Sequence, residues 1–198
     1  MLYALAHFLR DKTPWVWDLV NWINSFLFSI RYGQKLKEVE KSLHQERNES
    51  LKIVRLSDVP TEDMVHFFQQ QPEEAFRFFK PHGFTADAIR KLQRNKAFLG
   101  YVLLEKESGH IAGYCFNRSF FFGKGFRGRI VDINHRGQGL GTCMNKILNE
   151  VGFGIGLRLF ETVSKDNIAS YRSALSASNV RVVKELEDND LYLEILPN

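Results

Sequence analysis

The residues best suited to binding chemistry form a glycine-rich segment, Arg136-Gly137-Gln138-Gly139-Leu140-Gly141, between an expected strand and an expected helix. Its glycines lack a Cβ atom, so a ligand can approach the backbone closely. The first N–H groups of the following helix have no partner within the helix, and with the helix dipole they attract an anion. Arg136 adds a full positive charge. This combination is suited to a phosphate or pyrophosphate.

Two common phosphate-binding motifs do not fit this segment. A dinucleotide-binding loop has the spacing GxGxxG, whereas the spacing here is GxGxG. A Walker loop needs a lysine before a serine or threonine, but here Gly141 precedes Thr142 directly. From the segment alone, a phosphate site and a strand-to-helix turn that binds nothing both remain open.

The surrounding elements follow from hydrophobic periodicity and from turn residues. After a strand at 51–56 we expect helices near 60–70 and 85–94, then a hairpin of 98–104 with 111–122. A short strand, 129–133, leads into the glycine-rich segment and its helix, and 157–163, 167–177, 180–186 and 191–196 follow as strand, helix, strand, strand. Hairpins mixed with crossover helices predict an α+β fold, with a mixed sheet and helices on its faces.

We expect two regions, an N-terminal helical extension (1–49) and one domain (50–198). The extension has a helix start at Thr13-Pro14, then a mostly aromatic and aliphatic stretch containing Trp15, Trp17 and Trp22, and then a charged helix at 38–46. Three roles stay open for residues 1–31: packing on the domain, forming a homodimer, or lying in a membrane interface as a peripheral contact.

Composition narrows the class of protein. The chain has 198 residues, 44% hydrophobic and 25% charged, which is ordinary for a globular protein. A net charge of +4 without a Lys/Arg-rich block argues against nucleic-acid binding. The two cysteines are far apart and form no CxxC, so we expect no metal site. Without a convincing signal peptide or a long apolar run, we expect a cytoplasmic protein, peripheral at the inner membrane face if the extension binds there.

The stretch from Val131 to Gly141 resembles the acetyl-CoA-binding motif of the GNAT superfamily of N-acetyltransferases, (Q/R)xxGx(G/A). Arg136, Gly139 and Gly141 occupy its specified positions. The resemblance extends over about residues 51 to 196, because the order of elements matches as well. It implies a mostly antiparallel sheet with a splayed central strand pair.

The resemblance also implies a set of residues that bind acetyl-CoA as co-substrate. The backbone of Val131 and Ile133 would face the pantetheine arm, and Asn167 and Ser170 would touch the cofactor from the following helix. The pyrophosphate would be held beside Arg136 by the N–H groups of the segment from Gly137 to Thr142, namely Gly137, Gln138, Gly139, Leu140, Gly141 and Thr142.

The catalytic groups depart from the pattern of the family. Many GNAT enzymes have a tyrosine seven residues after the asparagine as general acid, but here that position is Ala174. Tyr171 is the remaining candidate, and a core tyrosine is the alternative. Glu161 is the candidate general base, because a carboxylate in an apolar row is either functional or paired.

The resemblance implies an N-acetyltransferase in which a primary amine attacks acetyl-CoA directly. The extension and the aromatic segment 76–84 look like those of bacterial GNAT proteins linked to polysaccharide synthesis, which implies an amino sugar as acceptor. The missing tyrosine keeps open the alternative of a catalytically inactive CoA-binding module, or of a module that docks on a membrane or a partner.

Overall fold

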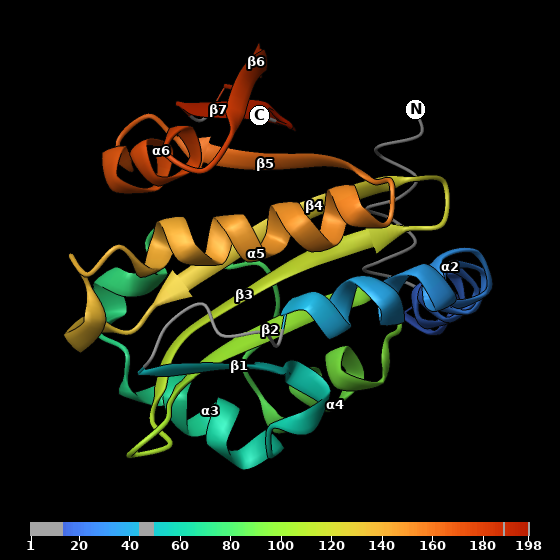
Figure 1. Cartoon of the computed structure of the whole chain (residues 1–198), viewed down its shortest axis with the longest axis horizontal. Coiled ribbons are helices and arrows are strands. Elements are labelled where there is room, and N and C mark those ends of the chain that lie inside the picture. Colours follow the sequence, from blue (N-terminus) through green and yellow to red (C-terminus); the bar gives the residue numbers. More distant parts are fainter. Residues whose placement is uncertain (1–13, 44–49, 188, 198) are drawn as a thin grey trace.

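The computed structural model describes residues 14–43, 50–187 and 189–197 (Figure 1). In addition to three short 3-10 helices, the elements are, in chain order, α2 (Pro14–Leu43), β1 (Leu51–Arg55), α3 (Thr61–Gln70), α4 (Ala86–Arg94), β2 (Phe98–Glu105), β3 (Ile111–Phe120), β4 (Lys124–Val131), α5 (Leu140–Gly154), β5 (Arg158–Ser164), α6 (Ile168–Leu175), β6 (Asn179–Glu185) and β7 (Asp190–Leu196). The order of elements predicted for the domain is confirmed.

The strands form one sheet in the order β1-β2-β3-β4-β5-β7-β6, and every neighbouring pair is antiparallel except β4 with β5. That parallel pair is short: Lys124, Gly125 and Phe126 of β4 lie opposite 158–160 of β5, and beyond them the two strands part. The predicted α+β fold with a mixed, mostly antiparallel sheet is therefore confirmed.

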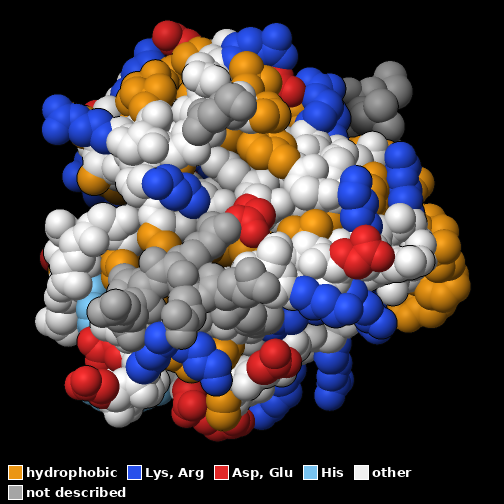
Figure 2. Space-filling view, viewed as in Figure 1, with side chains coloured by type: hydrophobic (Ala, Val, Ile, Leu, Met, Phe, Trp, Pro, Cys, Tyr) orange, Lys and Arg blue, Asp and Glu red, His pale blue; other side chains and the backbone are white. Residues whose placement is uncertain are grey.

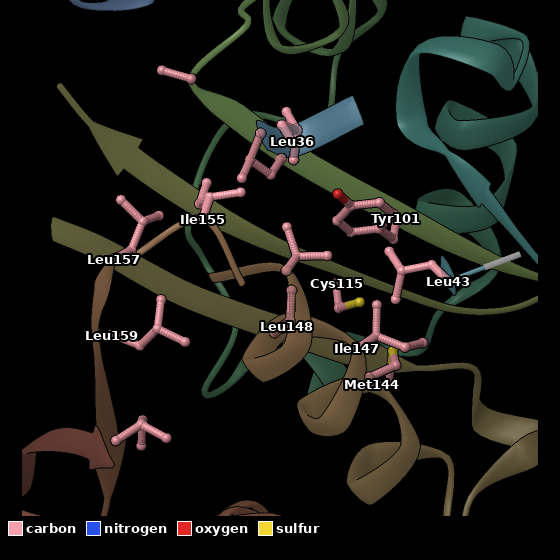
Figure 3. Close-up of a cluster of buried hydrophobic side chains, with 14 of the residues drawn as sticks. Leu36, Leu43, Tyr101, Cys115, Met144, Ile147, Leu148, Ile155, Leu157 and Leu159 are labelled. Carbon is pink, nitrogen blue, oxygen red and sulfur yellow. The ribbon is translucent and has the colours of Figure 1, made fainter. Parts of the chain in front are cut away.

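Alternation along the strands builds one apolar core on each face of the sheet. In β2, Leu99, Tyr101 and Leu103 face α2 and α5, whereas Phe98 and Val102 face α3 and α4. Figure 3 shows the first core, where side chains of α5 point at the sheet beside leucines of α2. Helices thus cover both faces.

Helix α5 has the apolar periodicity that its burial requires. Met144, Ile147, Leu148 and Val151 recur at helical spacing and are fully buried. Each such side chain contributes about 1.5–3 kcal/mol by leaving water. This packing fixes the N-terminal end of α5 beside the end of β4.

Strand β4 differs from the prediction. It begins at Lys124 and ends at Val131, so the expected strand at 129–133 was placed too late, and Ile133 lies in a 3-10 helix, Ile133–His135. Gly125 and Gly128, which lie between the expected strands 111–122 and 129–133, belong to β4. A Cβ at Gly128 would lie 2.6 Å from Cζ of Phe116, so only glycine lets that ring pack across the sheet.

The N-terminal extension also differs from the prediction. One continuous helix, α2, replaces the two expected, while the proposed cap Thr13 lies outside the described residues. Phe28, Tyr32 and Leu36 of α2 are buried in the core that α5 shares. One face of this helix is therefore part of the folded core, and the boundary at residue 49 stays a prediction.

Candidate functional site

The N-terminal end of α5 is open for an anion. Gly139 is its N-cap with φ +77°, and Gly137 has the same φ. A Cβ at either glycine would meet nothing within 4 Å, so the backbone there is uncovered. No side chain caps the helix and no acidic residue lies in its first turn. The N–H groups of residues 140–142 are thus available to a ligand, as the sequence predicts.

A polar network holds the entry to this loop in place. Asp132 is buried, and its carboxylate accepts hydrogen bonds from Gln71 Nε2 (2.8 Å), Asn134 N–H (2.9 Å) and the Nδ1 of His135 (2.9 Å). The other ring nitrogen of His135 lies 2.9 Å from Glu105 Oε1. This hydrogen bond to Glu105, with the one to Asp132, raises the pKa of His135 despite partial burial. The loop therefore leaves the strand in a fixed direction.

The backbone of β4 points into the space where β4 and β5 part. Asp132 N–H, just after β4, donates to Ala112 O of β3 (3.0 Å). In an antiparallel ladder these groups alternate, so the N–H and C=O groups of Arg129 and Val131 face away from β3, toward β5. The β4–β5 pairing ends before them at Phe126. An extended ligand could pair with these free groups.

Two arginines and a glutamate span the same opening. Oε2 of Glu161 on β5 lies 2.6 Å from Nε of Arg127 and 3.1 Å from Nη1 of Arg129, both on β4. Arg129 Nη2 also donates to the carbonyl and hydroxyl oxygens of Ser170 and to Ser173 Oγ. The cluster ties β4 to β5 and to α6 where no backbone pairing does.

Burial alone would raise the pKa of Glu161, but the charges of Arg127 and Arg129 outweigh it and hold that pKa below its usual range. A carboxylate with a lowered pKa is a weak base, because a general base works best when its pKa lies near the working pH. Oε1 of Glu161 is buried and has no hydrogen-bond partner within the described residues. The geometry favours a positioning role for this carboxylate.

A cavity of about 1070 Å³ lies at this opening. One part is lined by the glycine loop and α6, and another by residues 74–81 together with Phe116 and Arg118. These two sets of residues come from opposite faces of the sheet, so the cavity passes through the sheet where β4 and β5 part. It can therefore bring a phosphate-bearing ligand and a second molecule together from two sides.

The part near residues 74–81 is cationic and aromatic. Arg77, Lys80 and Arg118 line it along with Phe78 and Phe79, against one acidic residue of the segment 74–81 in the lining, Glu74. Arg77 Nη2 lies 3.9 Å from a carboxylate oxygen of Asp166, whereas no carboxylate within the described part of the chain pairs with Arg118. This region suits a molecule that carries a negative charge.

The structure brings most of the predicted site residues together. The cavity is lined by Val131, Arg136, Gly137, Gly139, Leu140, Gly141, Thr142, Glu161, Asn167 and Ser170. Asn167 caps α6 by accepting a hydrogen bond from Ser170 N–H (3.2 Å). Three predicted residues are not among the lining residues: Ile133, Gln138 and Tyr171. Ile133 N–H donates to Gln71 Oε1 (3.1 Å), and Tyr171 packs against the main core.

Sequence reasoning missed the arginines. Arg127 and Arg129 alternate along one strand, so both side chains lie on the same face of β4. That spacing, beside a lone Glu161 in an apolar strand, was a signal for a buried ion pair. Arg118 and Gln71 had no comparable signal, since their neighbours come from distant segments.

Within 14–43, 50–187 and 189–197, no group of three or more His, Cys, Asp or Glu is placed to hold a metal ion. No helix in that part of the chain is long and apolar enough to cross a membrane.

Comparison with solved structures identifies proteins that share this fold. The GNAT domain of S. lividans PAT has a TM-score of 0.62 at 14% identity, over 73% of this chain and 89% of that one. The protein yncA of Salmonella typhimurium, solved with its cofactor acetyl-CoA, has 0.56 at 17%, over 75% and 94%. The N-acetyltransferase PseH of Campylobacter jejuni has 0.54 at 14%, over 73% and 96%. No family model and no curated protein matches the sequence.

Proposed function

We propose that this chain, which has the GNAT fold, transfers an acetyl group from acetyl-CoA to a primary amine. The observation that carries the proposal is the through-sheet cavity, which joins an uncapped helix N-terminus to a second, cationic chamber. Such a shape suits two substrates that meet in the opening between the strands. Positioning the two is the main contribution that the protein makes to the rate.

The residues present fit acetyl-CoA. Gly137 and Gly139 leave the backbone open for a pyrophosphate, with Arg136 exposed beside it and without an ion pair within the described residues. The free N–H and C=O groups of Arg129 and Val131 match the amides of a pantetheine arm. When bound, acetyl-CoA supplies the thioester whose carbonyl carbon the amine attacks, so that a C–N bond forms and the C–S bond breaks.

The chain's own groups would orient the two substrates and polarise the acetyl carbonyl. Backbone N–H groups on the inner edge of β4 would donate to the acetyl carbonyl oxygen as negative charge develops there. Glu161 would hold Arg127 and Arg129 in place. Its role as general base, and that of Tyr171 as general acid, stay predictions, and water is the alternative carrier of both protons.

For the acceptor we propose an amino sugar of a bacterial surface-polysaccharide pathway, in a cytoplasmic reaction. The cationic chamber supports an acceptor that also carries an anionic group, such as a phosphate ester, because Arg118 has no carboxylate partner among the described residues. The nearby phenylalanines Phe78 and Phe79 offer an apolar wall for a sugar ring.

The alternative is a GNAT-fold module that binds CoA without turnover. Ala174 at the usual tyrosine position, Tyr171 outside the cavity and the engaged Glu161 favour it. Acetyl-CoA binding without acetyl transfer to any amine in a panel would support this alternative.

The test is thermal unfolding with and without acetyl-CoA. At about 100 times its dissociation constant, a ligand stabilises the fold by about 2.7 kcal/mol, a visible shift in Tm. Gly139→Trp should abolish that shift. Gly156→Trp is the matched control, because Gly156 also has a positive φ and open space at its Cβ but lies outside the cavity lining. If the wild-type protein is folded but its Tm does not rise with acetyl-CoA, the proposal is contradicted.

A further inference from the structure

Where α2 packs on the domain, one face of the helix stays exposed to solvent. Trp15, Leu19, Trp22, Phe26 and Ile30 recur every three or four residues and so form one stripe along the helix. They are 69%, 47%, 63%, 54% and 69% exposed, respectively. A different face of the same helix carries Phe28, Tyr32 and Leu36, which are buried in the core. The packing of α2 on the domain therefore does not explain the stripe.

The tip of the β3–β4 hairpin adds to this apolar surface. Phe121 and Phe122 are exposed there. Arg31 Nη1 donates to Phe121 O (2.9 Å), and Asn24 Oδ1 accepts from Phe121 N–H (3.0 Å). The hairpin tip is thus fixed beside the helix. Figure 2 shows hydrophobic side chains gathered at the edge where α2 lies in Figure 1, with Lys and Arg side chains next to them.

Most of the charged side chains around the stripe are basic. Lys37 and Lys41 follow Ile30 at helical spacing on the same face, and both are exposed. The stretch from Pro14 to Lys37 contains a single acid, Asp18, which lies 2.9 Å from Lys91 Nζ. Lys37 and Lys41 thus continue the aromatic stripe, next to the exposed Glu38, and neither lysine forms an ion pair within the described residues.

The combination of aromatic and lysine side chains distinguishes between a protein partner and a membrane surface as what covers the stripe. Protein interfaces are enriched in aromatic residues but depleted in lysine. A membrane surface attracts both, because Trp and Phe enter the headgroup layer while Lys and Arg meet anionic lipids. We propose that the α2 stripe and the hairpin tip bind the surface of an anionic lipid bilayer, with α2 lying flat in the interface. The stripe from Trp15 to Ile30 is about 23 Å long at 1.5 Å per residue.

The experiment is co-sedimentation of the full chain with vesicles of phosphatidylcholine alone and with about one third phosphatidylglycerol. The wild-type protein should bind the anionic vesicles, and more weakly at high salt. The double substitution Trp22→Ser/Phe26→Ser should weaken binding by at least about tenfold, as expected for two aromatic side chains. Lys37→Gln/Lys41→Gln should remove the preference for anionic vesicles.

Matched controls keep this test independent of folding and of acetyl transfer. Val182→Ser/Val183→Ser removes two exposed apolar side chains on β6 and should leave vesicle binding unchanged. Deleting α2 is avoided because Phe28 is fully buried. Unchanged Tm values confirm that the variants fold. The proposal is overturned if the wild-type protein does not bind anionic vesicles, or if Trp22→Ser/Phe26→Ser binds them as strongly as the wild type. It is also overturned if the wild type is a dimer and this double variant is a monomer.

Discussion

Nε of Arg127 on β4 lies 2.6 Å from Oε2 of Glu161 on β5, and both side chains are almost completely removed from water. The pair bridges the two strands just beyond the point where their backbone pairing ends. Two positive charges, those of Arg127 and Arg129, depend on this one carboxylate.

Glu161→Gln should therefore destabilise the fold. Removing one partner of a buried ion pair leaves charge without compensation, at a cost of about 3–5 kcal/mol. Chemical denaturation measures the loss. Glu62→Gln, which breaks the exposed pair with Arg90, is the control and should cost about 1 kcal/mol or less. A loss as small as the control's would contradict the positioning role, and a pH–rate profile of a folded variant would test Glu161 as a base.

Tyr171→Phe should leave the rate of acetyl transfer nearly unchanged. Tyr171 packs on the core and is not among the residues that line the cavity. A general acid contributes about 10²–10⁴-fold to a rate, so steady-state kcat distinguishes the two roles. A loss in that range, with an unchanged Tm, would establish Tyr171 as the acid.

Arg118→Gln should raise KM for an anionic acceptor by about tenfold or more while leaving kcat close to the wild-type value. A hydrogen bond to a charged group contributes about 1.5–3 kcal/mol. This prediction rests on the proposed function. Arg94→Gln, whose side chain is exposed on α4 outside the cavity lining, is the control. Equal KM values for the two variants would remove Arg118 from acceptor binding.

His82 predicts a pH dependence of stability. Burial lowers its pKa to about 4, against the hydrogen bond to Gly83 O, and its other nitrogen lies 3.1 Å from Tyr114 Oη. The unfolded chain takes up this proton first, since the ordinary pKa is 6.5. Stability should therefore fall as pH drops from 6.5 to 4.

To test this pH dependence, the thermal unfolding of His82→Phe is compared with that of the wild type across the same pH range. The slope of stability with pH should be shallower in the variant than in the wild type. Parallel slopes would show that His82 keeps its ordinary pKa.

Much of the fold could be predicted because its signals are local. The apolar spacing of Met144, Ile147 and Leu148 lies within one helix, and Gly139 marks the start of that helix within a few residues. The sequence signals a buried ion pair between Glu161 and the two arginines of β4, but the geometry of that pair could not be predicted, because it depends on how β4 and β5 lie against each other. The register of a parallel pair joined through a helix is not encoded in either strand alone.

The same limit applies to the start of β4 and to α2. Gly125 and Gly128 are typical of a loop, and only the close approach of Phe116 and Leu159 from other elements explains their place in a strand. In α2, apolar residues surround most of the helix, so the sequence could not separate the core-facing Phe28 from the exposed Phe26. That choice is made by tertiary packing.

The short β4–β5 pairing also bears on solubility. Where two strands part, their inner edges carry unpaired N–H and C=O groups, and such edges invite the addition of a strand from another chain. Here the two edges face each other within the sheet, while α5 contacts both strands and Arg129 links β4 to α6. A whole foreign strand is therefore kept out, but a slender chain with amide groups can enter. The interrupted sheet thus selects what enters it by cross-section.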